Sequence, residues 1–268
     1  MIDIGVIGGT GFYRFFASRD EVRAETPYGP PSAPVTIAEF AGRTVGFVPR
    51  HGRHHEHLPH RVPYRANLAA LKELGASQIV GFNVVGSLSP QVKKGDFLVM
   101  DQFIDVTWGR AETIFDGSDG AHADLADPYC GRLRALVLDA LRDSDETIHD
   151  RATVLVINGP RFQTKAENRW YSTLGADAIN MTQSTEAMLA RELELCYVNL
   201  SYCTDYGVIA DELAPESGDE PIVHQEIVDE FQRNLPRVER VVAAALAAIP
   251  PEADCRCRHA LDGCRVAT

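Results

Sequence analysis

The sequence predicts an α/β protein in which a single domain is built from a central β-sheet with flanking helices. Short apolar runs that end in glycine or polar residues recur along the chain, as buried strands of such a sheet do. Residues 175–211 read as strand, turn, helix and strand, with an apolar run at 196–204 that ends in Asp205. Ligands of open α/β sheets bind beyond the carboxyl ends of the strands, so this stretch predicts a site near Met181, Thr182 and Asp205.

Chain length, net charge and the lengths of the apolar runs exclude several classes of protein. With 268 residues and no repeat or Gly/Pro/Ser-rich linker, the chain is expected to form one domain over residues 1–250, followed by a short tail at 251–268. The net charge of −12 argues against a nucleic-acid partner, and an anionic substrate must be held by local donors. No apolar run approaches the ~20 residues of a membrane span, and no secretion signal is recognisable. We expect a cytoplasmic protein without a membrane partner.

The first strand is predicted at residues 2–7, where an apolar run stops at Gly8-Gly9-Thr10-Gly11. Glycines let backbone amides approach a phosphate closely, which makes this turn a candidate anion site. The turn lacks the Lys and Ser/Thr of a Walker A loop and the full spacing of a dinucleotide-binding loop. Taken alone, it equally fits an ordinary tight turn.

A second strand, at residues 44–48, runs into the histidine-rich segment PRHGRHHEH at 49–57. One interpretation is a metal site, but the segment has no HExxH pattern. The other makes Arg50 and His51 anion donors at a strand end, because a planar guanidinium suits phosphate oxygens. Given the glycine turn upstream, the phosphate interpretation is favoured. Four further residues fit a solvated basic loop: Arg53, His54, His57 and His60.

The remaining elements follow from periodicity and turn residues. Leucines at helical spacing predict a helix that opens at Val62-Pro63-Tyr64 and ends at Gly75. We further predict a strand at 78–85 ending in Gly86, a pair of strands at 96–106, a strand at 152–157, and helices at 132–142, 184–195 and 221–249, the last broken at Pro236. Residues 109–128 have no period, and a loop of about twenty residues is usually functional. His122 lies within it.

The six cysteines do not suggest a disulfide framework in a chain of this size. Cys130, Cys196 and Cys203 lie in or beside apolar segments, as small core residues do. The tail carries four ligand-type side chains: Cys255, Cys257, His259 and Cys264. Their spacing fits no standard zinc module, so a metal site and a Cys255–Cys257 redox pair are alternatives to an unstructured tail, which we favour.

Together the motifs resemble the trimeric purine nucleoside phosphorylases, and within them the 5′-methylthioadenosine phosphorylases. The matching segments, in family order, are GVIGGTGFY (5–13), TPYGPPS (26–32), PRHGRHHEH (49–57), VPYRANLAALKELG (62–75), VVGSL (84–88), DQFIDVT (101–107), ADPYC (126–130), GPRFQTKAE (159–167), GADAINMT (175–182), EAMLARELELCY (186–197) and TDY (204–206). The resemblance implies the nucleoside phosphorylase fold, with a central mixed twisted sheet, and a homo-oligomer, either a trimer or a hexamer. It also implies a purine nucleoside and inorganic phosphate as substrates, with no metal or organic cofactor.

The resemblance also implies a role for each site residue. Phosphate would be bound by Thr10, Arg50, His51, the backbone at Val84, and Thr182. Phe162 would stack on the purine, Gln163 would lie near its edge, and Met181 would lie under the ribose. Asp205 would be the catalytic acid, donating to purine N7 and accepting from a 6-amino group. His122 would line the 5′ pocket of a neighbouring subunit.

Some residues depart from the family pattern and leave the substrate open. Thr185 stands where relatives carry proline, Gly207 replaces a second acidic residue, and Asn83 and Val84 replace small residues of the phosphate loop. The alternative substrate is therefore a 6-oxopurine nucleoside or 5′-methylthioinosine. Two other classes are a nucleosidase that uses water instead of phosphate, and a zinc-binding or redox-regulated binding protein.

Overall fold

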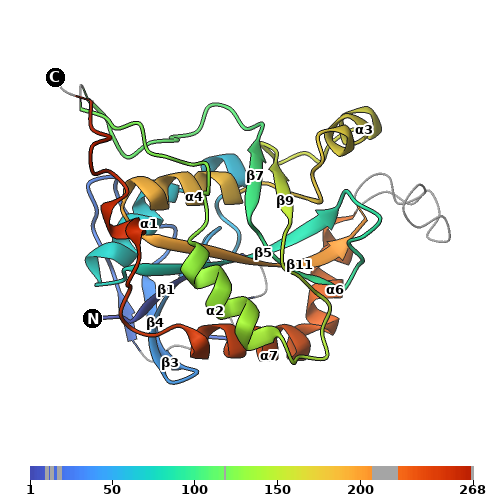
Figure 1. The fold of residues 1–268 in the computed structure, drawn as a ribbon, viewed down its shortest axis with the longest axis horizontal. Helices are drawn as coiled ribbons and strands as arrows, with labels where there is room; N and C mark the ends of the chain where they lie inside the picture. The colour runs from blue at the N-terminus through green and yellow to red at the C-terminus, as the bar shows by residue number, and fades with distance from the viewer. Residues whose placement is uncertain (10–11, 13–14, 17–19, 118, 207–222, 267–268) are drawn as a thin grey trace.

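A computed structural model describes residues 1–9, 12, 15–16, 20–117, 119–206 and 223–266. Within them, eleven strands form one mixed sheet (Figure 1). The strands are β1 (Ile4–Gly8), β2 (Asp20–Val22), β3 (Val35–Phe40), β4 (Arg43–Pro49), β5 (Gln78–Ser87), β6 (Phe97–Val99), β7 (Gln102–Asp105), β8 (Ile148–His149), β9 (Thr153–Val156), β10 (Ala178–Asn180) and β11 (Cys196–Asp205). Their order is β2-β3-β4-β1-β5-β10-β9-β7, and β11 pairs with β5 and β6. The predicted α/β fold with a mixed sheet is confirmed.

The long strands β5 and β11 form the centre of the sheet. They pair in parallel from Cys196 opposite Gln78 to Asp205 opposite Gly86, with an irregularity between Cys203 and Asp205. Nearly every residue of both strands is buried, because helices cover both faces of the sheet. β4, β1, β5 and β11 all run in parallel, so their carboxyl ends meet at one edge.

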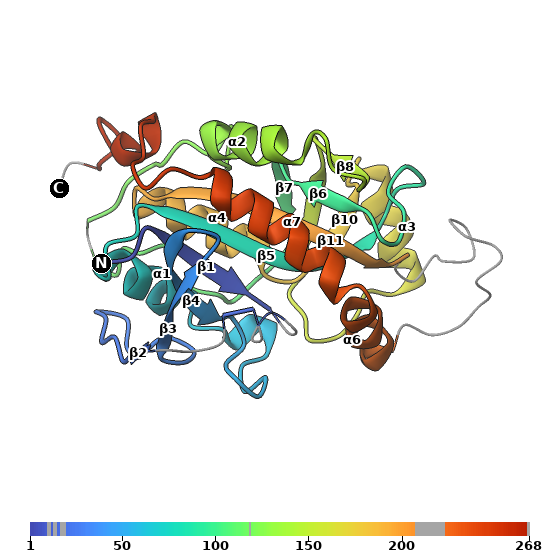
Figure 2. The ribbon, with the colours of Figure 1, turned by 90° about the horizontal axis from the view of Figure 1, so that it is seen from below.

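The helices form a layer on each face. They are α1 (Tyr64–Glu73), α2 (Gly131–Leu141), α3 (Lys165–Thr173), α4 (Gln183–Glu192), α6 (His224–Arg233) and α7 (Leu235–Ala248). α1 and α4 pack with one set of strand residues, while α2, α6 and α7 pack with the other set (Figures 1 and 2). None of the described helices is long and apolar enough to cross a membrane.

Two predicted features differ from the structure. The helical region at the C-terminal end breaks at Asn234, which ends α6 and precedes α7. Pro236 lies in the first turn of α7, where its missing N–H costs no helical hydrogen bond, so it helps to start a helix instead of breaking one.

The tail is also structured, contrary to expectation. Residues 251–266 are described and include a 3-10 helix, η5 (Arg256–His259). Cys257 and Ala253 are buried in the same apolar cluster as α2 and α7. The unstructured-tail interpretation is therefore wrong.

Candidate active site

A cleft of about 420 Å³ opens where the parallel strands end. It brings together the predicted site residues Arg50, His51, Val84, Phe162, Gln163, Met181, Thr182 and Asp205. These residues come from β4, β5, β11, the segment after β9 and the turn between β10 and α4. The strand-end position follows from the parallel pairing of β4, β1, β5 and β11.

Arg50 is fully buried and forms a bidentate ion pair with Glu186 of α4. Its Nε donates to Glu186 Oε1 at 2.5 Å, and its Nη2 donates to Oε2 at 3.0 Å. Tyr197 of β11 donates its phenol to the same Oε2 at 2.8 Å. Burial alone would lower the pKa of Arg50, but the charge of Glu186 and its hydrogen bonds raise it, so the guanidinium stays charged.

The ion pair limits what Arg50 can offer to an anion. Nη2 also lies 3.3 Å from Asn83 Oδ1, and Nη1 donates to the Phe82 carbonyl at 2.9 Å. One N–H of Nη1 is left without a partner among the described residues. It faces the turn after β1, since a Cβ added to Gly9 would lie 3.3 Å from Nη1. Arg50 can therefore give an anion one hydrogen bond, not the planar two-donor contact that the sequence suggests.

Thr182 lies directly before α4, so an anion beside its hydroxyl also meets the N-terminus of that helix. Asn83 Nδ2 donates to Thr182 Oγ1 at 2.9 Å. Asn199 Nδ2 donates to Asn83 Oδ1 at 2.6 Å, which fixes the orientation of the Asn83 amide. Because Thr182 Oγ1 accepts from Asn83, its own proton is left to donate into the cleft.

His51 is neutral in this setting. Its Nδ1 lies 2.8 Å from the carbonyl oxygen of His57, so Nδ1 carries the proton and Nε2 is an acceptor. Burial and the nearby charge of Arg50 lower the pKa of His51 to about 3. In the absence of an anion the neutral ring therefore offers an acceptor at Nε2, in place of the donor that the sequence suggests.

Asp205 ends β11 and is half-buried at the cleft. Thr204 Oγ1 lies 2.9 Å from Asp205 Oδ2 and 3.3 Å from the carbonyl of Val85. The glycine opposite leaves room for this carboxyl group, because a Cβ at Gly86 would lie 2.7 Å from Asp205 Oδ1. The irregular pairing of β11 and the missing side chain at Gly86 together place the carboxyl group.

Phe162 and Met181 belong to the apolar lining of the cleft. Gln163 Nε2 donates to Asn168 Oδ1 of α3 at 3.2 Å, which orients its amide. Arg110, from the long loop, donates to the carbonyl of Met181 at 2.7 Å and lies 3.2 Å from Thr185 Oγ1. Arg110 therefore holds the turn that carries Met181 and Thr182.

Two predicted residues are not placed in the cleft. Thr10 lies outside the described residues. His122 is exposed and does not line the cleft of its own chain. Its backbone N–H donates to the Cys264 carbonyl at 2.9 Å, which pairs this part of the loop with the tail.

Several residues in and around the cleft carried no sequence signal. Glu186 is one of many acidic residues in helical sequence, and Arg110 lies in a loop without pattern. His55 and His224 also line the cleft, with ring centroids 5.8 Å apart. His55 belongs to the histidine-rich segment but was not singled out there, and only the packing of α6 against β11 brings His224 to it.

Parallel strand ends, a helix N-terminus suited to an anion, and an aspartate beside an apolar slot define a nucleoside-phosphorylase type of site. Residues 3–247 match the family model of the phosphorylase superfamily, so the chain belongs to that family.

Relatives of known name cover almost the whole chain. An S-methyl-5′-thioadenosine phosphorylase from Thermofilum pendens is 44% identical over 263 residues, covering 97% of each chain. A purine nucleoside phosphorylase from Streptomyces coelicolor is 47% identical and covers 97% of this chain and 95% of its own. A crystal structure of a methylthioadenosine phosphorylase from an antarctic soil metagenomic library superposes with a TM-score of 0.88 at 36% identity, covering 98% of this chain and 92% of its own. The fold prediction and the family resemblance are confirmed.

The ion pair gives a stability prediction. Glu186→Gln leaves the charge of Arg50 buried without its counter-charge, which should cost roughly 3–5 kcal/mol of unfolding free energy. The matched control is Tyr197→Phe, which removes a single hydrogen bond to the same carboxylate and should cost about 1 kcal/mol. Thermal or urea unfolding at neutral pH measures both. Equal costs for the two variants would contradict a central role for the ion pair.

The neutral state of His51 gives a pH prediction. The pKa of His51 is about 3 in the folded protein, below the ordinary value of 6.5. Its contribution to the free energy of unfolding is therefore fully present above pH 6.5 and is lost as the pH falls towards 3, because the unfolded chain takes up the proton first. The loss should reach about 2 kcal/mol at pH 5. His51→Asn keeps an amide N–H for the His57 carbonyl but does not titrate, so its thermal midpoint should fall less between pH 7 and 5.

The control for this pH dependence is His54→Asn, at an exposed histidine of the same loop. It should retain the full decrease seen in the unmodified protein. If His51→Asn shows that same decrease, His51 is not the group that couples folding to pH.

Proposed function

We propose that the protein catalyses phosphorolysis of 5′-methylthioadenosine, or a related 5′-modified adenine nucleoside, to adenine and 5-methylthioribose 1-phosphate. The observation that carries the proposal is the pairing of β5 with β11. Val84 lies opposite Tyr202 and Gly86 opposite Asp205, so one strand pair brings the proposed phosphate region within two residues of the proposed acid. The names of the Thermofilum relative and of the metagenomic structure support this substrate.

On the phosphate side, the proposed donors are the Thr182 hydroxyl, the N-terminus of α4, the backbone at Val84, one N–H of Arg50 and the turn at Thr10. A phosphate oxygen forms the bond to ribose C1′ as the bond from C1′ to purine N9 breaks. The phosphate dianion also stabilises positive charge that develops on the ribose. His51, being neutral, would accept a hydrogen bond from a protonated phosphate oxygen or from the sugar.

On the purine side, Asp205 is the proposed catalytic acid. As the bond to N9 breaks, its electron pair enters the purine, and a neutral Asp205 gives its proton to N7. Its other oxygen accepts from the 6-amino group. Phe162 and Met181 supply apolar surface for the ring and the ribose, and Gln163 lies near the purine edge. We propose that no metal or organic cofactor takes part in this reaction.

The alternative substrate is a 6-oxopurine nucleoside. The name of the Streptomyces relative favours it, as does the absence of a second acid at Gly207, a position outside the described residues. We also propose a cytoplasmic enzyme of purine and methionine salvage that works as a homotrimer or hexamer, with His122 completing the 5′ pocket of a neighbour.

The function is tested with 5′-methylthioadenosine and 5′-methylthioinosine, each with and without phosphate. Turnover should require phosphate and yield a pentose 1-phosphate with free base. A site that pairs with the 6-amino edge can reject the other base by up to ~10⁴-fold, so kcat/KM should be higher for the adenosine form. Asp205→Asn should reduce or reverse that ratio, because its amide N–H can donate to the 6-oxygen of a 6-oxopurine, whereas the neutral acid presents an acceptor oxygen to the 6-amino group.

Three outcomes would contradict the proposal. Full turnover in phosphate-free buffer would indicate a nucleosidase. A preference of the unmodified enzyme for the inosine form would indicate the alternative substrate. If Asp205→Asn leaves the ratio of kcat/KM for the two nucleosides unchanged, Asp205 does not determine which purine is accepted.

The proposed shared site predicts an effect of His122→Ala. This substitution should raise KM for 5′-alkylthio nucleosides severalfold while KM for phosphate stays nearly constant. His259→Ala, at an exposed tail histidine, is the control. A fully active monomer in analytical ultracentrifugation would contradict the subunit arrangement.

A further inference from the structure

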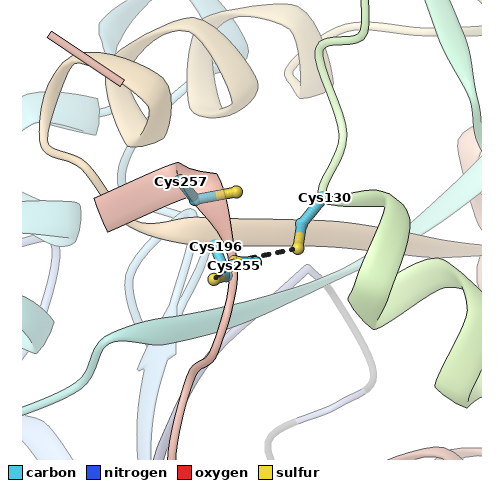
Figure 3. Close-up of side chains that lie close together, drawn as sticks. All are labelled: Cys130, Cys196, Cys255 and Cys257. Atoms are coloured by element: carbon cyan, nitrogen blue, oxygen red, sulfur yellow. Dashed lines mark hydrogen bonds between the residues drawn. The ribbon is translucent and has the colours of Figure 1, made fainter. Parts of the chain in front are cut away.

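Four cysteines from three separate segments meet far from the cleft (Figure 3). Cys130 precedes α2, Cys196 begins β11, and Cys255 and Cys257 belong to the tail. All four Sγ atoms lie within 4.8 Å of one another. Cys130 and Cys196 are therefore not isolated core residues, as their sequence context suggested.

The separations of the sulfurs bracket those expected around a single shared ion. Cys130 Sγ lies 3.8 Å and Cys196 Sγ lies 3.1 Å from Cys255 Sγ. In a tetrahedral site with Zn–S bonds of about 2.3 Å, the sulfurs are about 3.8 Å apart. A disulfide needs about 2.05 Å between two sulfurs and joins them in pairs. Here one sulfur, that of Cys255, approaches two others, and the fourth lies within the same small volume.

The surroundings suit a negatively charged cluster. Four thiolates around Zn²⁺ carry a net charge of −2, which needs a nearby cation or N–H donors. Arg132 is such a cation, because its guanidinium neighbours the sulfurs of Cys196 and Cys255. The Nε of Arg132 is buried without a hydrogen-bond partner among the described residues. Cys130 also sits at the N-terminus of α2, where the helix favours an anion.

We propose that Cys130, Cys196, Cys255 and Cys257 bind one zinc ion. Four protein ligands leave no open position, so the site is structural and not catalytic. The ligands that the sequence alone suggested are thereby corrected. Cys255 and Cys257 belong to the site, whereas His259 is exposed beside Asp262 and Cys264 lies outside the cluster.

The ion would fasten the tail to the domain, and the tail in turn supports the long loop. Ala121 forms a β-bridge with Arg265, and the N–H of Val266 donates to the Gly120 carbonyl at 2.9 Å. The start of the tail is held separately, because Gln78 Nε2 donates to the Pro250 carbonyl at 2.7 Å. Zinc thus stabilises the backbone at His122 and just before it without touching the substrate cleft.

The test is the metal content and sulfur coordination of the full-length protein, purified under reducing conditions from zinc-supplemented cells. Elemental analysis should give about one zinc ion per chain, and X-ray absorption should give four sulfur ligands at about 2.3 Å. Cells grown with cobalt instead should yield protein with the charge-transfer absorption of a tetrahedral thiolate site. Cys257→Ser should lose most of the metal, whereas Cys264→Ser, from the same tail, should keep it.

Three results would overturn the proposal. The first is an intact mass that shows disulfides among these cysteines with no bound metal. The second is protein with four free thiols that takes up no zinc when Zn²⁺ is supplied. The third is Cys257→Ser that retains the full zinc content. If Cys257→Ser fails to fold, stoichiometry and X-ray absorption of the unmodified protein still decide the question.

Discussion

The cleft depends on a buried ion pair between Arg50 at the end of β4 and Glu186 in α4. Burying either charge alone would be costly, so each side chain requires the other. The pair holds α4 against the strand ends, and it needs space that Gly81 provides. A Cβ at Gly81 would lie 2.3 Å from the Tyr197 phenol that completes the carboxylate's hydrogen bonds. These buried polar groups around Arg50 and Glu186 therefore fix the position of the α4 N-terminus.

A protein with a net charge of −12 attracts no anion through its overall field. The structure supplies positive potential locally instead. Glu186 neutralises most of the charge of Arg50, and His51 is uncharged, so the remaining attraction comes from one guanidinium N–H, the Thr182 hydroxyl and the end of α4. Such a site binds by oriented hydrogen bonds, which favours an anion of defined shape over anions in general.

The sequence predicted the sheet, most helices and several strand-end residues of the cleft because those signals are local, whereas the roles of Phe162 and Gln163 came only from the family resemblance. Apolar runs that end in glycine locate strand ends, and parallel pairing then brings the ends of β4, β5 and β11 together. Glu186, Arg110 and His224 could not be predicted this way, since each acts through a partner remote in sequence. The cysteines show the same limit: the tail spacing alone argued against a metal site, because two of the four clustered sulfurs lie on other elements.

The strand β11 also explains why the sulfur cluster and the cleft can influence each other only indirectly. Cys196 begins this strand of 10 residues and Asp205 ends it, so the two lie roughly 30 Å apart along an extended backbone. The loop over residues 109–128 connects the two regions. At one end Arg110 holds the carbonyl of Met181, and further along the loop Ala121 and His122 pair with the tail. A loosened tail would therefore release the middle of the loop first, while Arg110, with its separate bonds to Asn158, Met181 and Thr185, would keep the cleft end in place. The two parts of the loop therefore have different roles. Its start positions residues at the cleft of its own chain, and its middle exposes His122 on the surface.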